Sequence, residues 1–330
     1  MKRLAILLFS TLLITVTSFA QNYNELLKET HEKFKGLNGG ANADYIPFLA
    51  NVPSNLFGIS IVTADGKVFE AGDTKYEFGI ESISKAFVLC KAMMEVGPDS
   101  IAHAIGVNAT GMPFNSVIAI ELEGYSPVSP LVNAGAMATN SMIKGPNKDA
   151  QWQIVLNHLS DMAGRPLKVL DELYKSEAAT NQHNRAIAML LDAYGHMWAD
   201  PIDACDSYTK QCSVGVTAKD LAVMAGVLAN GGVNPITKKR ILDEKYVPKI
   251  LAVMSMEGLY QTSGTWLFHV GLPGKSGVGG GVIAVVPGRM AIAAFSPPLD
   301  PVGNSVRSMA AINYISEKLN LNLYSSSSKK

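Results

Sequence analysis

The chain has 330 residues, of which 48% are hydrophobic and 17% charged, and its 28 basic and 28 acidic residues leave a formal net charge of zero. A balanced charge without a long run of either sign argues against nucleic acid as a partner. The hydrophobic fraction is ample for the core of one large domain or two smaller ones.

The first residues have the pattern of a signal peptide. Two basic residues precede an apolar run from Leu4 to Ala20, and a small side chain also stands at Ser18, just ahead of Gln21. Such a run followed by a small-residue cleavage site is typical of an exported protein. The alternative is a membrane anchor, but the run is short for a span of roughly 20 residues. We expect removal of residues 1–20 and a periplasmic or secreted protein that is not membrane-bound; an uncleaved chain would stay in the cytoplasm.

Cysteine and histidine do not point to a metal site. The three cysteines, Cys90, Cys205 and Cys212, are too few for a disulfide framework. Cys205 and Cys212 could pair after export, and the sequence leaves this open. The six histidines show neither a pair four residues apart nor a nearby cysteine pair. We therefore expect no metal and no cofactor.

The first strong secondary-structure signal is a hairpin. The segment LFGISIVTADGKVFEAGD, residues 56–73, carries β-branched and aromatic residues on both sides of Asp65 and Gly66. An Asp-Gly pair favours a tight turn between two strands. From Ser82 to Val96 apolar residues recur every three or four positions and a Gly-Pro pair follows, which predicts a helix.

The middle of the chain is predicted to be helical, and strands return near its end. Residues 100–230 alternate amphipathic segments with loops that contain glycine and proline. Three strands are predicted over 265–272, 280–288 and 289–296, and a closing helix over 306–320. Strands at both ends with helices between them predict one sheet built from both chain ends, with a helical insertion.

The stretch ESISKAF places two serines, Ser82 and Ser84, ahead of Lys85 at the start of the predicted helix. Residues three apart share a helix face, whereas adjacent residues diverge by about 100°. Lys85 is therefore expected to face Ser82. A lysine activates a serine only when its amine is neutral, and apolar surroundings lower the pKa of an amine. Ser82 is the predicted nucleophile and Lys85 its base, although a capping serine near a surface lysine gives the same letters. Ser84 is expected to pack or cap.

The segment GLPGKSGVGGGVIAVV is glycine-rich, but it does not match the known phosphate-binding motifs. A phosphate loop would need glycine where the chain has His269, and a dinucleotide fingerprint fails at Val282. What remains is Lys-Ser-Gly, residues 275–277, at the edge of a strand, the place of the Lys-Thr-Gly element in penicillin-recognising enzymes. We expect the backbone N–H groups of Ser82 and Val278 to form an oxyanion hole; a plain glycine-rich strand junction is the alternative.

Taken together, several stretches make the chain resemble the bacterial and mitochondrial glutaminases. These stretches are ADYIPFLA (43–50), GDTKYEFGIESISK (72–85), SPLVNAGAM (129–137), YKSEAATNQHNRAIA (174–188), DSYTKQCSVGVT (206–217), MSMEGLYQTSGTW (254–266) and GLPGKSGVGGG (271–281). The resemblance implies an α/β, β-lactamase/transpeptidase-like fold. It consists of an antiparallel sheet built from both chain ends and flanked by helices, with a mostly helical middle subdomain.

The same resemblance implies boundaries for these parts. One serine-dependent glutaminase domain is expected over residues 21–324. Its sheet subdomain would cover about 40–80 and 255–320, and its helical subdomain about 82–250. A disordered tail is expected over 325–330.

Carried over position by position, the resemblance implies hydrolysis of L-glutamine to L-glutamate and ammonia. Ser82 would attack the side-chain amide carbon, and Lys85 would accept the proton of its hydroxyl. Tyr45 and Tyr260 match two further catalytic positions, which would relay a proton to the departing ammonia. The positions that match substrate contacts are Ser82, Asn133, Glu177, Asn184, Tyr208, Tyr260 and Val278.

The chain also departs from the pattern of this family in two places. His183 precedes Asn184 where many relatives have arginine, and the expected signal peptide is unusual because bacterial relatives are mostly cytoplasmic. Relatives imply a homo-oligomer, either a tetramer or a dimer. The sequence does not decide between glutamine, asparagine and other amides, and it indicates no activator.

Two other classes of function remain open at this point. An exported serine β-lactamase or D,D-peptidase-like enzyme would fit the Ser-x-x-Lys and Lys-Ser-Gly elements, but the hydroxyl expected two residues before Asn133 is replaced by Leu131. A non-catalytic amino-acid-binding protein on the same scaffold would keep Glu177, Asn184 and Tyr208 and would not need the serine–lysine pair.

Overall fold

The computed structural model describes residues 23–124 and 126–325. The predicted signal peptide, residues 1–20, lies outside this range, as do residues 326–330 of the predicted tail. Among the described helices none combines the length and the apolar character that a membrane crossing requires.

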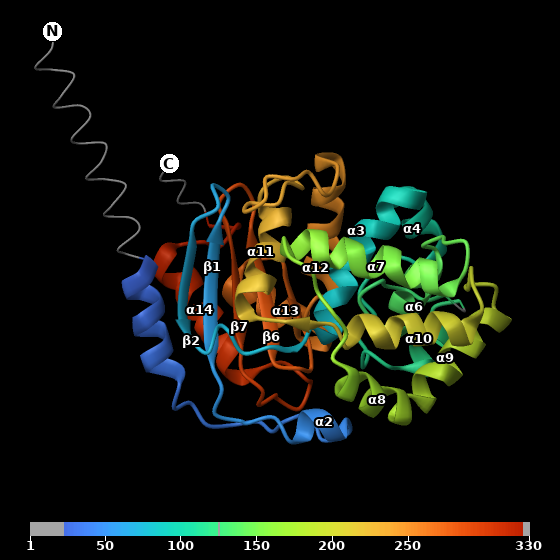
Figure 1. Cartoon of the computed structure of the whole chain (residues 1–330), viewed down its shortest axis with the longest axis horizontal. Coiled ribbons are helices and arrows are strands. Elements are labelled where there is room, and N and C mark those ends of the chain that lie inside the picture. Colours follow the sequence, from blue (N-terminus) through green and yellow to red (C-terminus); the bar gives the residue numbers. More distant parts are fainter. Residues whose placement is uncertain (1–22, 125, 326–330) are drawn as a thin grey trace, which may run out of the picture.

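A five-stranded antiparallel sheet forms the centre of the fold (Figure 1). Its order is β2-β1-β7-β6-β5, and the strands are β1 (Gly58–Thr63), β2 (Val68–Gly72), β5 (Gly274–Ser276), β6 (Gly281–Val286) and β7 (Met290–Phe295). The predicted hairpin at Asp65 and Gly66 is confirmed, because β1 and β2 pair on either side of it. β1 also pairs with β7, with Ile61 opposite Ile292. The two chain ends therefore build one sheet, as predicted.

The remaining elements are mainly helical. They are α2 (Pro47–Ala50), β3 (Phe78–Gly79), η1 (Glu81–Ile83), α3 (Ser84–Val96), α4 (Pro98–Ala104), α5 (Val117–Leu122), α6 (Asn133–Ser141), α7 (Lys148–Ala163), α8 (Asp171–Thr180), α9 (Gln182–Ala193), α10 (Pro201–Cys212), β4 (Gly215–Val216), α11 (Ala218–Ala229), η2 (Glu244–Tyr246), α12 (Val247–Glu257), η3 (Tyr260–Thr262), α13 (Ser263–Val270) and α14 (Val306–Leu319). Residues 23–34 form a further helix.

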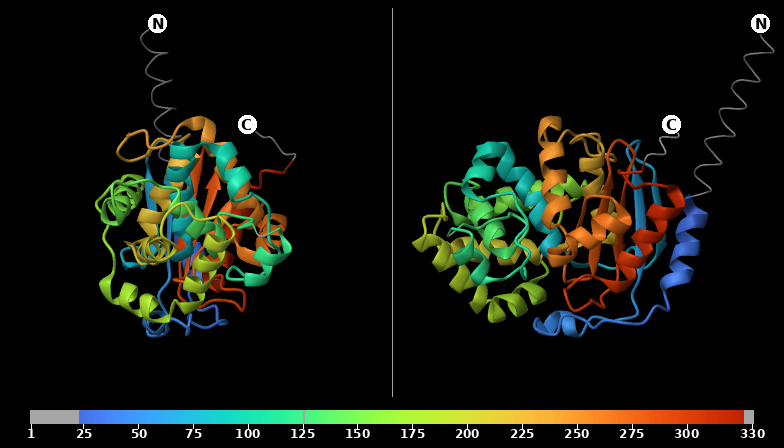
Figure 2. Two further views of the ribbon diagram at one scale, coloured as in Figure 1. Left: turned by 90° about the vertical axis from the view of Figure 1, so that its right-hand side faces the viewer. Right: turned by 180° about the vertical axis from the view of Figure 1, so that it is seen from behind.

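Helices cover both faces of the sheet (Figures 1 and 2). Along β6, Val282 and Ala284 join a core with α13, α14 and the helix at 23–34, whereas Ile283 and Val285 join the core of α11 and the middle helices. Alternate residues of a strand point to opposite faces, so a strand covered on both faces reads as one continuous apolar run. This explains why β6 and β7 were recognisable from the sequence. The architecture is the α/β, β-lactamase/transpeptidase-like one that was predicted.

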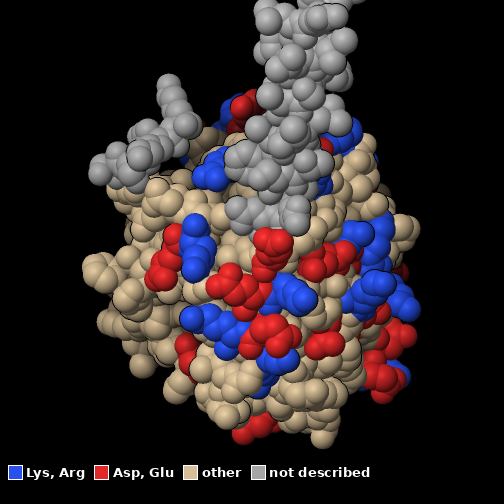
Figure 3. Space-filling model, turned by 90° about the vertical axis from the view of Figure 1, so that its left-hand side faces the viewer, with Lys and Arg blue, Asp and Glu red and all other residues tan. Residues whose placement is uncertain are grey.

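The outer surface of the sheet layer carries side chains of both charges. Acidic and basic side chains are interspersed on the face where the helix at 23–34 and α14 lie (Figure 3). Glu32 on that helix forms an ion pair of 2.6 Å with Lys35, which lies just beyond the end of the helix. Exposed pairs of this kind contribute little to stability.

The strand predicted over 265–272 is wrong, because these residues form helix α13 and its C-cap. Trp266 and Val270, four residues apart, are buried on one side of the helix, while Phe268 between them is 82% exposed. Gly271 has φ +68° and ends the helix in the left-handed conformation. The aromatic and β-branched composition favoured a strand, but burial follows the helical period. The edge strand is β5 instead.

Candidate active site

The turn that carries Ser82 joins the short strand β3 to helix α3. The predicted helix over 82–96 begins as the 3₁₀ turn η1, and α3 starts only at Ser84. Glu81 has φ +50°, a left-handed conformation that is uncommon for a residue with a side chain. The Ser84 hydroxyl donates to the carbonyl of Glu81 at 2.6 Å. Ser84 thus caps the turn, and Ser82 is free to face another direction.

Ser82 and Lys85 form a buried pair. The Lys85 Nζ lies 2.6 Å from the Ser82 Oγ, and the two residues are 6% and 1% exposed. Burial lowers the pKa of Lys85 to about 8. With a pKa of about 8, about a tenth of the molecules carry a neutral amine at pH 7, far more than for an ordinary lysine, and the neutral amine is the state that can accept a proton. The three-residue spacing predicted that Lys85 faces Ser82, and the two side chains are in contact.

Asn133, at the start of α6, is the hub of the polar site. Its Oδ1 accepts from Lys85 Nζ at 2.9 Å and from the Tyr208 hydroxyl at 2.9 Å. Its Nδ2 donates to Asn184 Oδ1 at 2.9 Å. The beginnings of α6 and α9 and the middle of α10 are in this way joined to the serine–lysine pair. Among the described residues, His183, next to Asn184, does not belong to this network. Its Nε2 lies 2.7 Å from the Asn115 carbonyl oxygen.

A second buried lysine, Lys275, approaches the site from β5. Its Nζ donates to the carbonyl of Ser276 at 2.7 Å and lies 4.5 Å from the centre of the Tyr260 ring. Burial, and then the charge of Lys85, hold the pKa of Lys275 well below its usual range. Burial raises the pKa of Tyr260, whose hydroxyl lies 3.5 Å from the same carbonyl. Two lysines thus share one desolvated region.

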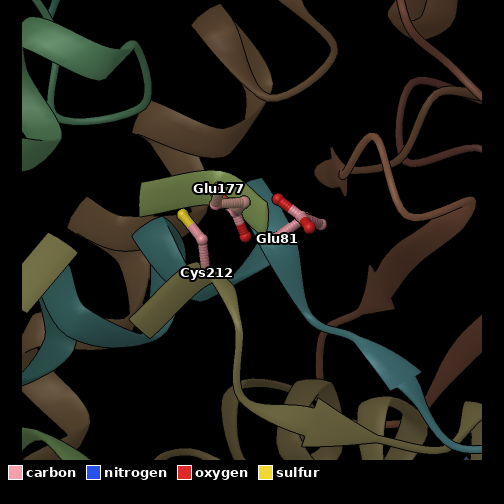
Figure 4. A group of neighbouring side chains, drawn as sticks. All are labelled: Glu81, Glu177 and Cys212. Atoms are coloured by element: carbon pink, nitrogen blue, oxygen red, sulfur yellow. The ribbon is translucent and has the colours of Figure 1, made fainter. Parts of the chain in front are cut away.

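Glu81, Glu177 and Cys212 form an acidic cluster where η1, α8 and α10 meet (Figure 4). One donor atom from each lies within 4.8 Å of the others. The Ser213 hydroxyl donates to Glu177 Oε1 at 2.9 Å. Burial raises the pKa of both carboxyl groups, and their mutual proximity raises that of Glu81 further. A cation placed between them would relieve this repulsion.

The Lys-Ser-Gly segment runs into a tight turn that presses against Glu81. A β-carbon on Gly277 would lie 3.0 Å from the Ile80 carbonyl oxygen and 3.2 Å from the Glu81 Cβ. One on Gly279 would lie 2.6 Å from the Gly79 oxygen. Glycine is therefore required by close backbone approach. Val278, between them, is 7% exposed, and its backbone is brought next to the turn of Ser82.

Tyr45 lies at the edge of the site, within electrostatic reach of Tyr260, Glu81 and Glu177. It is 53% exposed and lines a cavity of about 500 Å³ together with Phe114 and residues 299–303. The Phe114 ring centre lies 5.0 Å from that of Tyr260. Tyr45 is thus at the rim of the region that contains Tyr260, whereas Ser82, Lys85, Asn133, Asn184 and Tyr208 form one connected network.

Glu81, Cys212 and Lys275 were not among the predicted site residues, although the Lys-Ser-Gly segment itself was singled out. Glu81 directly precedes the predicted nucleophile and Lys275 begins the Lys-Ser-Gly segment, so both could have been found. For Cys212 the sequence held no signal. Cys205 and Cys212 are both free and lie seven residues apart on α10. A helix rises about 1.5 Å per residue, so they are too far apart for a disulfide.

Comparisons with known proteins identify the same family over most of the chain. A sequence model of the glutaminase family matches residues 40–324. A glutaminase of Brucella canis is 57% identical over 291 residues, covering 88% of this chain and 92% of that protein. A glutaminase of Mycobacterium marinum is 54% identical over 296 residues, covering 90% of this chain and 92% of that protein.

Solved structures give the same result. The probable glutaminase ybaS superimposes with a TM-score of 0.91 at 52% identity, covering 92% of this chain and 99% of that one. A probable glutaminase from Bacillus subtilis, complexed with 6-diazo-5-oxo-L-norleucine, gives a TM-score of 0.82 at 27% identity, with 90% and 95% of the two chains covered.

Proposed function

The chain belongs to the glutaminase family of amidohydrolases, and we propose that it hydrolyses L-glutamine to L-glutamate and ammonia through a γ-glutamyl ester on Ser82. The observation that supports this most directly is the 2.6 Å contact between Lys85 Nζ and Ser82 Oγ. A buried amine with a lowered pKa beside a hydroxyl is the arrangement that makes serine a nucleophile.

The amino-acid end of the substrate is held by one carboxylate and by neutral hydrogen-bond donors. Glutamine is a zwitterion, and its ammonium group binds at Glu177, where a cation relieves the repulsion from Glu81. The α-carboxylate accepts hydrogen bonds from the remaining amide hydrogens of Asn133 and Asn184, and Tyr208 orients Asn133 by donating to its Oδ1. Charge-assisted hydrogen bonds are short and directional, so they fix one end of the substrate while the other end reacts.

The chemical step is an acyl transfer. Neutral Lys85 removes the hydroxyl proton while Ser82 Oγ attacks the amide carbon, and the oxyanion accepts hydrogen bonds from the N–H groups of Ser82 and Val278. The protonated Lys85 returns the proton to the departing nitrogen, with Tyr45 and Tyr260 as relays, and the carbon–nitrogen bond breaks. Water then attacks the γ-glutamyl ester in the same way, which releases glutamate and restores the free serine. No step requires a metal or a cofactor.

The pH dependence follows from the lowered pKa of Lys85. The base must be neutral, and burial brings the pKa of Lys85 to about 8. We expect kcat/KM, which reports groups of the free enzyme, to rise between about pH 6 and about pH 9 with a midpoint near 8. Ionisation of Glu177, whose pKa is raised by burial, adds to the rise at the lower end. A profile that is flat or that falls over this range would contradict the assignment of Lys85 as the base.

Three assays on the purified enzyme separate this function from the alternatives. They measure ammonia release from glutamine, turnover of a chromogenic β-lactam, and binding of glutamine without turnover. Release of ammonia is expected, with no β-lactam turnover, because Leu131 stands where penicillin-recognising enzymes have a hydroxyl. Turnover of the β-lactam alone, or binding alone, would refute the proposal. Asparagine and other amides as substrates in the first assay define the specificity.

We also propose that the enzyme is exported and forms a homo-tetramer or dimer. The apolar run over residues 4–20, followed by the small-residue site before Gln21, supports cleavage of residues 1–20. N-terminal sequencing of the protein purified from its native host should therefore begin at Gln21, and a retained Met1 would refute export by cleavage.

Light scattering measures the oligomeric state, and a monomer in solution would contradict the proposed tetramer or dimer. The sheet and helical subdomains, with the boundaries given above, form one domain in this proposal.

A further inference from the structure

A continuous chain of side-chain hydrogen bonds crosses the helical part of the molecule and ends at the turn of Ser82. Its links run Gln151 Nε2 to Asn140 Oδ1 at 2.9 Å, Asn140 Nδ2 to Gln211 Oε1 at 2.7 Å, and Gln211 Nε2 to Ser84 Oγ at 3.2 Å. The Ser84 hydroxyl then donates to the carbonyl of Glu81 at 2.6 Å. Helices α7, α6, α10 and α3 each supply one member.

The series of hydrogen bonds runs in one direction. Each amide accepts at its oxygen and donates from its nitrogen to the next member, and the Ser207 hydroxyl donates to Gln151 Oε1 at 3.0 Å at the outer end. Hydrogen bonds arranged head to tail polarise one another. Ser84, Asn140 and Gln211 are fully buried, so a broken link leaves a polar atom without water to replace its partner. Gln151 is only partly buried and lines a surface cavity of about 420 Å³.

The last acceptor belongs to the peptide that supplies a catalytic N–H. The carbonyl of Glu81 and the N–H of Ser82 are the two ends of one planar peptide unit and point in opposite directions. Fixing the carbonyl therefore fixes the direction of the N–H. Glu81 is left-handed at φ +50°, and such a conformation persists only where the surroundings hold it.

We propose that Gln151, Asn140 and Gln211, acting through Ser84, are positioning residues that orient the Glu81–Ser82 peptide so that its N–H points at the developing oxyanion. The proposal rests on the proposed function, in which this N–H is an oxyanion donor. It gives Ser84 a role beyond capping. In this proposal the four residues are not substrate contacts and act on the transition state through the peptide that Ser84 holds.

The test compares kcat and KM for glutamine hydrolysis in Ser84→Ala and Gln211→Met. Loss of one oxyanion donor typically lowers kcat by about 10²- to 10³-fold, and a misdirected donor loses part of this. We expect each variant to lower kcat by about tenfold and to change KM by less than about twofold, because the groups that hold the amino-acid end are untouched. The double variant should lose no more than about as much as the more affected single variant, since the two residues act as one unit.

Ser141→Ala is the matched control. Ser141 lies on α6 beside Asn140, is 3% exposed, donates to the Ala138 carbonyl at 2.7 Å and accepts from the Trp198 N–H at 3.1 Å. It therefore loses one donated and one accepted hydrogen bond, as Ser84→Ala does, but outside the chain of amides. Its melting temperature should fall while its kcat stays at the wild-type value.

If Ser84→Ala and Gln211→Met behave like this control, with lower stability and unchanged kcat, the proposal is overturned. Should both fail to fold, Gln151→Met at the partly buried outer end decides: a lower kcat at constant KM supports the proposal, and an unchanged kcat overturns it. Ser82→Ala is assayed in parallel. Activity retained in Ser82→Ala would refute the proposed function itself. An inactive Ser82→Ala together with fully active Ser84→Ala and Gln211→Met would refute only the positioning role.

Discussion

Replacing Ser82 with alanine is expected to abolish ammonia release from glutamine. The substitution removes the atom that forms the γ-glutamyl ester, and neither Lys85 nor the oxyanion donors can replace it. Loss of the nucleophile in a serine hydrolase typically lowers kcat by about 10⁴- to 10⁶-fold. The side chain is small and 6% exposed, so the fold should tolerate the change. The measurement is ammonia release under saturating glutamine, with binding of glutamate by calorimetry to show that the site is intact.

Ser84→Ala is the control for this result. Ser84 lies two residues away on the same turn but contacts the Glu81 carbonyl and Gln211 instead of Lys85. Even with the tenfold loss expected from its positioning role, it should retain at least about a hundred times the activity of Ser82→Ala. Equal losses in the two variants would contradict the assignment of Ser82 by helix geometry.

Replacing Lys85 with alanine is expected to be nearly as damaging. Without the amine, Ser82 Oγ loses the base that it contacts, and the hydroxyl remains a poor nucleophile. The two residues act as one proton-transfer unit, so the double variant should be no slower than about the slower single variant. The site should stay folded, because the Tyr208 hydroxyl continues to donate to Asn133 Oδ1 when the amine is gone.

Lys91→Ala provides the matched lysine control for that experiment. Lys91 lies on the same helix and pairs with Glu95 at 2.8 Å, away from the serine. It should keep wild-type kcat with little loss of stability, since partly exposed ion pairs contribute little. Substantial turnover by Lys85→Ala at neutral pH would show that another group, such as Lys275, is the base.

Local signals in the sequence predicted a large part of this fold. The Asp65-Gly66 turn predicted β1 and β2, and the apolar runs that became β6 and β7 are each covered by helices on both faces. The strand predicted over 265–272 failed because aromatic and β-branched residues do not by themselves distinguish a strand from a short helix. The helix at 23–34 was not predicted, although Leu26 and Leu27 are buried against the sheet layer.

The site was predictable where its members share one local element. Ser82 and Lys85 belong to one turn of chain, so spacing alone joined them. Glu177 and Cys212 meet Glu81 only because α8 and α10 converge on η1, and the sequence carries no local trace of that convergence. The left-handed backbone of Glu81 and the amides that anchor it were equally hidden, because they depend on four helices packed together.

Strand β1 lies between β2, its neighbour along the chain, and β7, which is synthesised near the end. The sheet therefore has a high contact order, and its central pairing waits until almost the whole chain has left the ribosome. Pairings between such distant segments form slowly, because the entropy of closing the long loop is lost before the stabilising strand contacts form. A chain that ends before residue 290 leaves one side of β1 without its partner strand, and an open apolar strand is a template for aggregation. Completion of the C-terminal hairpin is thus the event that protects the N-terminal one.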